Sequence, residues 1–179
     1  MSEPKRDKNS LRVPAATVFR SPVHLLAFWF GSGLSPKAPG TAGTVAAIPL
    51  WLLLLPLHLS LPAYLALLVV LFAFGCWLCG ESAERLGVHD YGGIVFDEVV
   101  GLLITCIPLL PALGRAGHGD WWWLLAAFAL FRLFDIWKPW PVSWADQKIK
   151  GGLGIMLDDI FAGLMALAVL TLLQHFLLP

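Results

Sequence analysis

The chain has 179 residues, of which 58% are hydrophobic and 13% are charged, whereas globular domains carry about 25% charged residues. It contains 12 Lys and Arg and 12 Asp and Glu, so its formal net charge is zero. This composition excludes a disordered, collagen-like or coiled-coil chain, and the absence of a basic excess argues against a nucleic-acid-binding protein. Long apolar runs, at about 20 residues per bilayer crossing, predict an all-α integral membrane protein.

The N-terminal region divides into a polar tail and a short apolar segment. Residues 1–20 carry five of the 12 Lys and Arg residues and are expected to form a disordered cytoplasmic tail. The apolar segment 23–30 is too short to cross a bilayer, so it predicts an interfacial helix, followed by a polar loop over residues 31–41. Residues 21–179 are then expected to form one membrane-embedded domain.

The rest of the chain contains apolar segments that predict a polytopic helical bundle with four or five spans. They cover residues 43–59, 62–80, 94–113, 121–137 and 157–178, approximately. The first contains Pro49 and Pro56 and is the least regular as a helix. A cytoplasmic N-terminus places ten Lys and Arg residues inside and only Arg115 outside, which is the expected bias of membrane proteins.

Ionisable residues within spans are costly and are functional by default. In this chain they converge on one depth, the cytoplasmic end of the spans. Asp97 and Glu98 begin the third span, and Arg132 and Asp135 end the fourth, on one helix face. Asp158 and Asp159 are expected to begin the fifth.

An alternative is that these residues compensate helix dipoles or extend to the headgroups. That explains single residues but not two adjacent acidic pairs, nor Asp135 at a helix C-terminus, where the dipole opposes a negative charge.

Grouped carboxylates favour a hard divalent cation, Mg²⁺, Mn²⁺ or Ca²⁺. We expect the ligands to come from Asp97, Glu98, Asp135, Asp158 and Asp159. Adjacent helical residues diverge by about 100°, so we rank Asp97 and Asp159 below their neighbours for direct ligation.

Groups suited to phosphate lie at the same depth. Arg132 offers a planar donor fork and Lys37 a point charge. The segment 39–44, with Thr41 and Thr44, leads into a helix N-terminus, where free amides attract anions. The glycine-rich segment 151–154 leads into Asp158 in a similar way. Neither segment matches a nucleotide-binding fingerprint, so we expect no nucleotide cofactor and predict phosphoryl chemistry on a lipid.

These residues lie in three blocks that resemble the phosphatidylglycerophosphatase A family. The blocks are GSGLSPKAPGTAGT over residues 31–44, IVFDEVVG over 94–101, and FRLFDIWKPWP over 131–141 continuing to GGLGIMLDDIFAG over 151–163. The resemblance implies removal of the terminal phosphate of phosphatidylglycerophosphate, with Mg²⁺, in the bacterial inner membrane. The Lys and Arg distribution predicts that the site lies on the cytoplasmic face. The resemblance also implies a functional set that comprises Asp97, Glu98, Arg132, Asp135, Asp158 and Asp159. From their position near the headgroup plane, we expect the substrate-binding residues to be Lys37, Thr41, Thr44, Arg132 and Lys138.

Other functions and mechanisms stay open at this point. A carboxylate-containing transporter would place its site near the bilayer midplane, often between repeats, and neither feature is evident. A lipid phosphotransferase with CDP-linked donors would carry a D-x-x-D-G-x-x-A-R pattern, which the chain lacks. Hydrolysis by direct water attack and by a covalent aspartyl-phosphate fit the same residues. The sequence gives no indication of oligomeric state.

Overall fold

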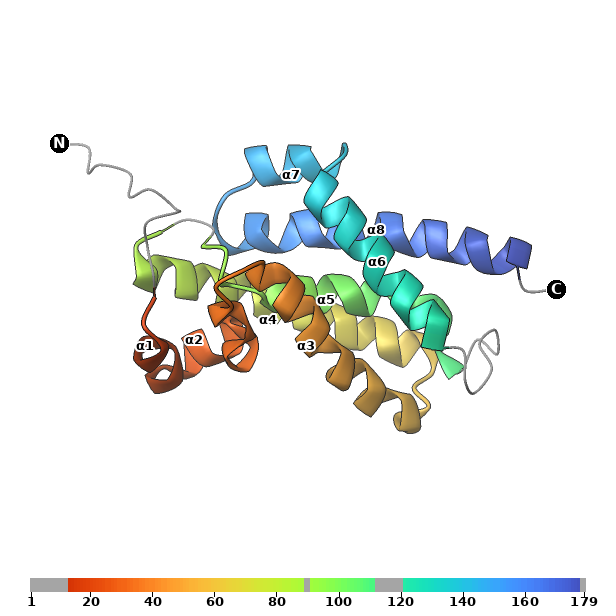
Figure 1. Ribbon diagram of the computed structural model, residues 1–179, viewed down its shortest axis with the longest axis horizontal. Helices are drawn as coiled ribbons and strands as arrows, with labels where there is room; N and C mark the ends of the chain where they lie inside the picture. Colours follow the sequence, from red (N-terminus) through yellow and green to blue (C-terminus); the bar gives the residue numbers. More distant parts are fainter. Residues whose placement is uncertain (1–12, 89–90, 112–120, 178–179) are drawn as a thin grey trace.

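The computed structural model describes residues 13–88, 91–111 and 121–177. Within these ranges all regular secondary structure is helical, as composition predicted. Most of the expected tail and the expected outer loop with Arg115 lie outside the described residues. Figure 1 shows a bundle in which the α3–α4 turn, the start of α6 and the end of α8 lie toward one end.

The N-terminal helices pack on the bundle. They are α1 (Ala15–Arg20), α2 (Pro22–Ala27) and the 3₁₀ helix η1 (Trp29–Leu34). Ser21 caps α2 by accepting a hydrogen bond from the His24 amide. Val18 is fully buried, so α1, which lies within the segment predicted as tail, packs against its neighbours through this residue.

The first long helices are α3 (Pro39–Leu54), which continues into η2 (Leu55–Leu57), and α4 (Leu61–Leu86). Helix α3 begins four residues before the predicted segment because Pro39 occupies its first turn, a position where a missing amide costs nothing. Thr41 and Thr44 therefore lie in a helix rather than in a loop. Helix α4 is capped by Ser60 and ends at Gly87, whose φ is 67°.

Helix α5 (Phe96–Thr105), followed by η3 (Ile107–Leu109), is the centre of the bundle. Its 10 residues extend about 15 Å, half of a typical hydrocarbon core, so the prediction of a full span over 94–113 is wrong. Pro108 removes a backbone donor just beyond the helix. Every residue of α5 except Glu98 is buried, and the helix packs against α3, α4, α6 and α8.

The C-terminal helices are α6 (Trp121–Trp137), α7 (Val142–Lys148) and α8 (Gly151–Leu177). Helix α8 begins six residues earlier than predicted, so Asp158 and Asp159 lie two turns inside it rather than at its start. The glycine-rich segment before them is helical because its glycines permit close packing. A Cβ at Gly152 would lie 1.7 Å from the Cys76 carbonyl oxygen.

Three helices in the described part of the chain are long and apolar enough to cross a membrane: Pro39–Leu57, Leu61–Leu86 and Gly151–Leu177. Helix α6 has 17 residues and measures about 25 Å. Most side chains of the three spans face outward, since only 22–28% of each apolar window is buried. The chain is therefore a membrane protein, with α5 enclosed by the longer helices.

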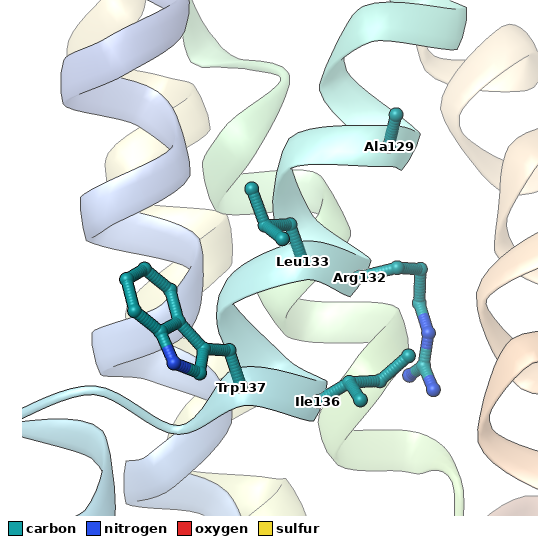
Figure 2. Close-up of a pocket in the computed structure, with 5 residues that line it drawn as sticks. All are labelled: Ala129, Arg132, Leu133, Ile136 and Trp137. Carbon is teal, nitrogen blue, oxygen red and sulfur yellow. The ribbon is translucent and has the colours of Figure 1, made fainter.

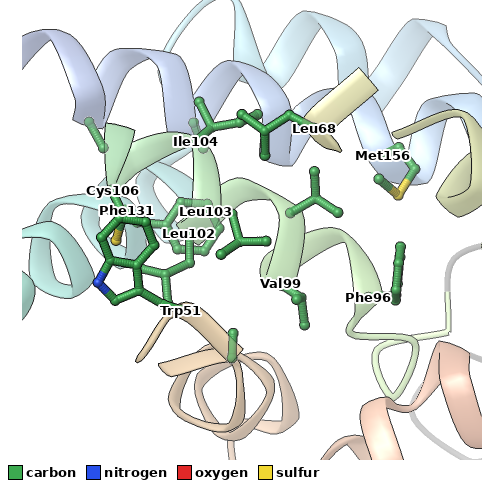
Figure 3. Packing of buried hydrophobic residues seen from close by; sticks show 14 of the residues in the cluster. Trp51, Leu68, Phe96, Val99, Leu102, Leu103, Ile104, Cys106, Phe131 and Met156 are labelled. Atoms are coloured by element: carbon green, nitrogen blue, oxygen red, sulfur yellow. The ribbon is translucent and has the colours of Figure 1, made fainter. Parts of the chain in front are cut away.

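The packing core surrounds α5 (Figure 3), where Leu102, Leu103 and Phe131 are fully buried. The Tyr64 hydroxyl of α4 donates a hydrogen bond to the Leu103 carbonyl at 2.8 Å. Helices α5 and α8 meet at glycines, because a Cβ at Gly163 would lie 2.6 Å from the Gly101 carbonyl oxygen. These contacts fix the two helices that carry the acidic pairs.

Candidate active site

A carboxylate cluster forms where α5 meets α8. Asp97, Glu98 and Asp159 each offer one oxygen, and these oxygens lie within 4.8 Å of one another. The Glu98 amide donates a hydrogen bond to Asp97 Oδ1 at 3.1 Å. Glu98 Oε2 and Asp159 Oδ2 are buried and have no hydrogen-bond partner among the described residues. Oxygens left in this state suit a hard divalent cation, the class to which Mg²⁺ belongs.

The order of ligands expected from the sequence differs from this geometry. Asp97 and Asp159 were ranked below their neighbours, yet both belong to the cluster, whereas Asp158 contacts Lys138. The reason lies in the helix bounds. Asp159 occupies the third turn of α8 and lies with the carboxylates of α5, and the 100° rotation between adjacent residues turns Asp158 toward Lys138.

Arg132 lies beside the carboxylate cluster. Its Nη1 forms an ion pair with Asp135 Oδ2, three residues along α6, and lies 3.8 Å from Glu98 Oε1. The three side chains are 12–13% exposed. Arg132 Nε is buried without a hydrogen-bond partner among the residues that the structure describes. Asp135 thus holds the guanidinium in place, and part of its donor fork is left for a ligand.

Lys138 forms two ion pairs, with Asp146 Oδ1 at 2.6 Å and with Asp158 Oδ2 at 2.8 Å. Burial opposes the charge of this ammonium, but the neighbouring Asp158 and Asp146 carboxylates raise its pKa above the usual value. The charged Lys138 therefore joins α7 to α8 and restrains Asp158. Sequence reasoning missed Asp146, because nothing in its spacing marks it as a partner of Lys138.

The first turn of α3 covers the Glu98–Arg132 pair. A Cβ added at Gly40 would lie 2.2 Å from Glu98 Oε1 and 3.2 Å from Arg132 Nη1. Gly40 was part of the predicted anion-binding segment, but its own role is visible only in the structure. The Thr44 hydroxyl donates to the Gly40 carbonyl at 2.9 Å, an arrangement that positions this turn.

Two other residues predicted to bind substrate lie at the edge of the site. Thr41 is half-buried on the first turn of α3, and Lys37 is exposed in the preceding loop. Lys37 forms no ion pair within the described ranges, and its carbonyl accepts a hydrogen bond from Ser35 Oγ at 2.8 Å. The structure thus brings together the carboxylates and Arg132 and leaves Lys37 outside that group.

The charges of the site are unbalanced. Within the described residues, the ion pairs of the site involve two cations, Arg132 and Lys138, against the carboxylates of Asp97, Glu98, Asp135, Asp146, Asp158 and Asp159. With all groups ionised, four negative charges remain, and like charges in a poorly solvated setting repel one another. This excess is a second feature that fits a bound divalent cation.

An outward-facing groove adjoins Arg132 on α6. It has a volume of ≈ 590 Å³ and is lined by Ala129, Arg132, Leu133, Ile136 and Trp137. Figure 2 shows these residues along one side of the helix, with the Arg132 side chain extending past Ile136. The groove connects the outer surface of the bundle to a residue of the buried site.

Comparison with known proteins identifies the family. Residues 25–174 match the profile of phosphatidylglycerophosphatase A. A phosphatidylglycerophosphatase A of Escherichia coli is 46% identical over 157 residues, covering 87% of this chain and 85% of the relative. Its counterpart in Haemophilus influenzae is 44% identical over 158 residues, covering 88% and 92%.

A third relative, from Bacteroides thetaiotaomicron, is provisionally named a phosphatidylinositol-3-phosphatase. It is 41% identical over 152 residues, covering 82% of this chain and 90% of the relative. No solved structure matches the chain significantly. The matched region contains the whole carboxylate cluster and Arg132, and it covers α5, α6 and all of α8 except its last three residues. The chain belongs to the phosphatidylglycerophosphatase A family.

Proposed function

We propose that this chain hydrolyses the terminal phosphate monoester of phosphatidylglycerophosphate, giving phosphatidylglycerol and inorganic phosphate. The observation that carries the proposal is the juxtaposition of Asp97, Glu98 and Asp159 with Arg132 at one end of a membrane bundle. A lipid phosphomonoester keeps its acyl chains in the bilayer, so its phosphate reaches only groups near a headgroup plane. Family membership supports the same substrate.

The donor set of the site supports Mg²⁺ as cofactor. Asp97, Glu98 and Asp159 would hold it, and Asp135 and Asp158 lie just beyond them. When bound, Mg²⁺ neutralises phosphate charge and makes water a stronger nucleophile.

The protein's own groups then have distinct roles. Arg132 binds the phosphate oxygens through its free donors, and its fixed orientation lets it stabilise charge that develops on them. Asp135 positions that guanidinium, and Lys138 positions Asp158. Lys37 and Thr41, at the exposed edge, contact the glycerol phosphate as it approaches. In one mechanism a carboxylate accepts the proton of a water that attacks phosphorus and displaces the lipid alkoxide, which takes up a proton to give phosphatidylglycerol. In the other, an Asp carboxylate attacks phosphorus and displaces the same alkoxide, and water then cleaves the aspartyl-phosphate to inorganic phosphate and the free carboxylate.

The proposed setting is the bacterial inner membrane, with the site on the cytoplasmic face. The relatives in Escherichia coli and Haemophilus influenzae are bacterial proteins, and the Lys and Arg distribution favours a cytoplasmic N-terminus. We propose that α6 crosses the bilayer beside the three longer spans, while α5 enters it only halfway.

The test is phosphate release from phosphatidylglycerophosphate in detergent mixed micelles. We expect chelation to abolish turnover and added Mg²⁺ to restore it. Asp97→Asn, Glu98→Gln and Asp159→Asn should each lose most activity while the protein stays folded. Glu84→Gln, an exposed carboxylate at the end of α4, serves as the matched control. Turnover unaffected by chelation, or full activity in the three cluster variants, would contradict the proposal.

The Bacteroides relative suggests a second substrate for the same assay, phosphatidylinositol-3-phosphate. This lipid also presents a phosphomonoester at the headgroup plane, so the cluster and Arg132 can meet it in the same way. We expect the glycerol-based lipid to be preferred, because the nearer relatives carry that name. A higher kcat/KM for the inositol lipid would reverse the assignment of substrate.

A further inference from the structure

The groove on α6 runs along the lipid-facing side of the helix. Ala129, Leu133, Ile136 and Trp137 follow one another at helical spacing, and the last three are 51%, 69% and 69% exposed. In a membrane bundle such a surface meets acyl chains. The small side chain of Ala129 leaves the hollow open at its deeper end.

Arg132 distinguishes this groove from an ordinary lipid-facing surface. A guanidinium beside lipid is costly unless it is paired, and its partners Glu98 and Asp135 belong to the active site. One residue thus lines the groove and contacts the catalytic carboxylates. The groove is therefore continuous with the site rather than a separate hollow.

The depth of the groove matches a lipid lying upright in one leaflet. Arg132 is five residues from the end of α6 at Trp137, about 7.5 Å along the axis, and Ala129 is about 4.5 Å deeper. Figure 2 shows the Arg132 side chain extending along the helix toward Ile136, with Ala129 one turn above it on the same side and the Leu133 side chain pointing to the other side. A phosphate at the guanidinium would have its acyl chains directed along Leu133 and Ala129.

We propose that this groove holds one acyl chain of the lipid phosphomonoester, so that the substrate enters sideways from the bilayer and its phosphate meets Arg132. The inference rests on the phosphatase function proposed above. The acyl chain acts here as a positioning element. Because displacement of a substrate by about 1 Å can cost about 10²-fold in rate, the groove sets selectivity for substrates that carry long chains.

The experiment compares kcat/KM for long-chain phosphatidylglycerophosphate in mixed micelles with kcat/KM for its water-soluble dibutyryl analogue. Ala129→Trp fills the deeper end of the groove, and Leu133→Trp fills it one turn nearer Arg132. We expect each to lower the long-chain to short-chain ratio about 10- to 100-fold. Ala73→Trp, at an exposed alanine in the middle of α4, is the matched control and should leave the ratio unchanged.

Thermal unfolding in detergent identifies variants that have lost their fold, and having two groove variants keeps the test decisive. An unchanged ratio in a folded Ala129→Trp or Leu133→Trp protein would overturn the acyl-chain assignment alone. Absence of hydrolysis of both lipids by the wild-type protein would instead overturn the phosphatase function, and the groove assignment with it.

Discussion

Arg132 combines a buried position, a carboxylate on either side and a donor without a partner among the described residues. Lys in its place would keep the charge and lose the planar fork. Hydrogen bonds to charged groups contribute about 1.5–3 kcal/mol, so we expect Arg132→Lys to lower kcat/KM roughly 10- to 100-fold. Steady-state kinetics in mixed micelles measures this effect, and the Mg²⁺ dependence should remain.

The matched control for Arg132→Lys is Arg85→Lys. Arg85 pairs with Glu81 at 2.7 Å on the exposed end of α4, and such surface pairs contribute about 0–1 kcal/mol. Its turnover should match the wild type. Wild-type turnover in Arg132→Lys as well would show that Arg132 serves only to neutralise Asp135, and Lys37 would be left as the cation for phosphate.

Gly40 offers a test that separates activity from stability. A Cβ at this position would meet Glu98 Oε1 at 2.2 Å, which is the mobile end of a side chain and can move aside at little cost to the fold. We expect Gly40→Ala to lower kcat at least about tenfold, because 1 Å displacements cost that much or more, while the melting temperature changes little. Gly92→Ala, where a Cβ meets nothing within 4 Å, should leave both quantities unchanged. A fully active Gly40→Ala enzyme would show that Glu98 is not held where it functions.

At the scale of helices, the crossing of α8 with α4 depends on backbone contact. A Cβ at Gly152 would lie 1.7 Å from the Cys76 carbonyl oxygen, and backbone cannot rotate away as a side chain can. Overpacking of this kind costs about 1–3 kcal/mol, so Gly152→Ala should lower the melting temperature in detergent and also reduce turnover, because Asp159 moves with α8.

Leu153→Ala is the comparison for Gly152→Ala, since the next residue of α8 is 46% exposed and faces away from α4. We expect it to unfold near the wild-type temperature. If Gly152→Ala also unfolds there, the two helices do not need to approach as closely as the structure has them.

The helix bounds show what periodicity and hydropathy could predict. The all-helical class is confirmed within the described residues, and the segment 121–137 is helical. The starts of α3 and α8 were placed too late because Pro39 and the glycines at 151–154 were interpreted as loop signals, whereas proline suits a first helical turn and glycine suits a close crossing. The predicted segment around α5 was too long because hydropathy measures how apolar a segment is. It does not tell whether lipid or other helices cover that segment.

The candidate site was predictable to the extent that it depends on charge and depth. The predicted topology places four residues at the same membrane depth, and the structure brings them together: Asp97, Glu98, Asp159 and Arg132. Which member of the Asp158-Asp159 pair joins the cluster depends on the rotation of α8 about its axis, and α8 is positioned by glycine contacts with other helices. Gly40 and Asp146 matter because of contacts with residues distant from them in sequence, and a single sequence does not reveal such contacts.

At the scale of the whole molecule, the positive-inside distribution predicts that the site faces the cytoplasm. We expect a cysteine at position 147, in the exposed part of α7, to react with a membrane-impermeant thiol reagent only from the cytoplasmic side. A cysteine at position 58, in the turn between α3 and α4, should react only from outside. Labelling is compared with the unaltered chain, whose Cys76, Cys79 and Cys106 lie in apolar segments. Labelling of position 147 from outside would reverse the orientation.

The glycine contacts that join α8 to α4 and α5 have a practical consequence for measurements on this protein. Asp97, Glu98 and Asp159 all lie on helices and are brought together by the spacing of the α5 and α8 axes. Turnover should therefore disappear in the same cooperative step as the bundle itself when a sample is heated. In a detergent or lipid preparation, the fraction of active molecules then equals the fraction of correctly folded molecules. Measuring phosphate release would therefore measure membrane insertion and folding directly.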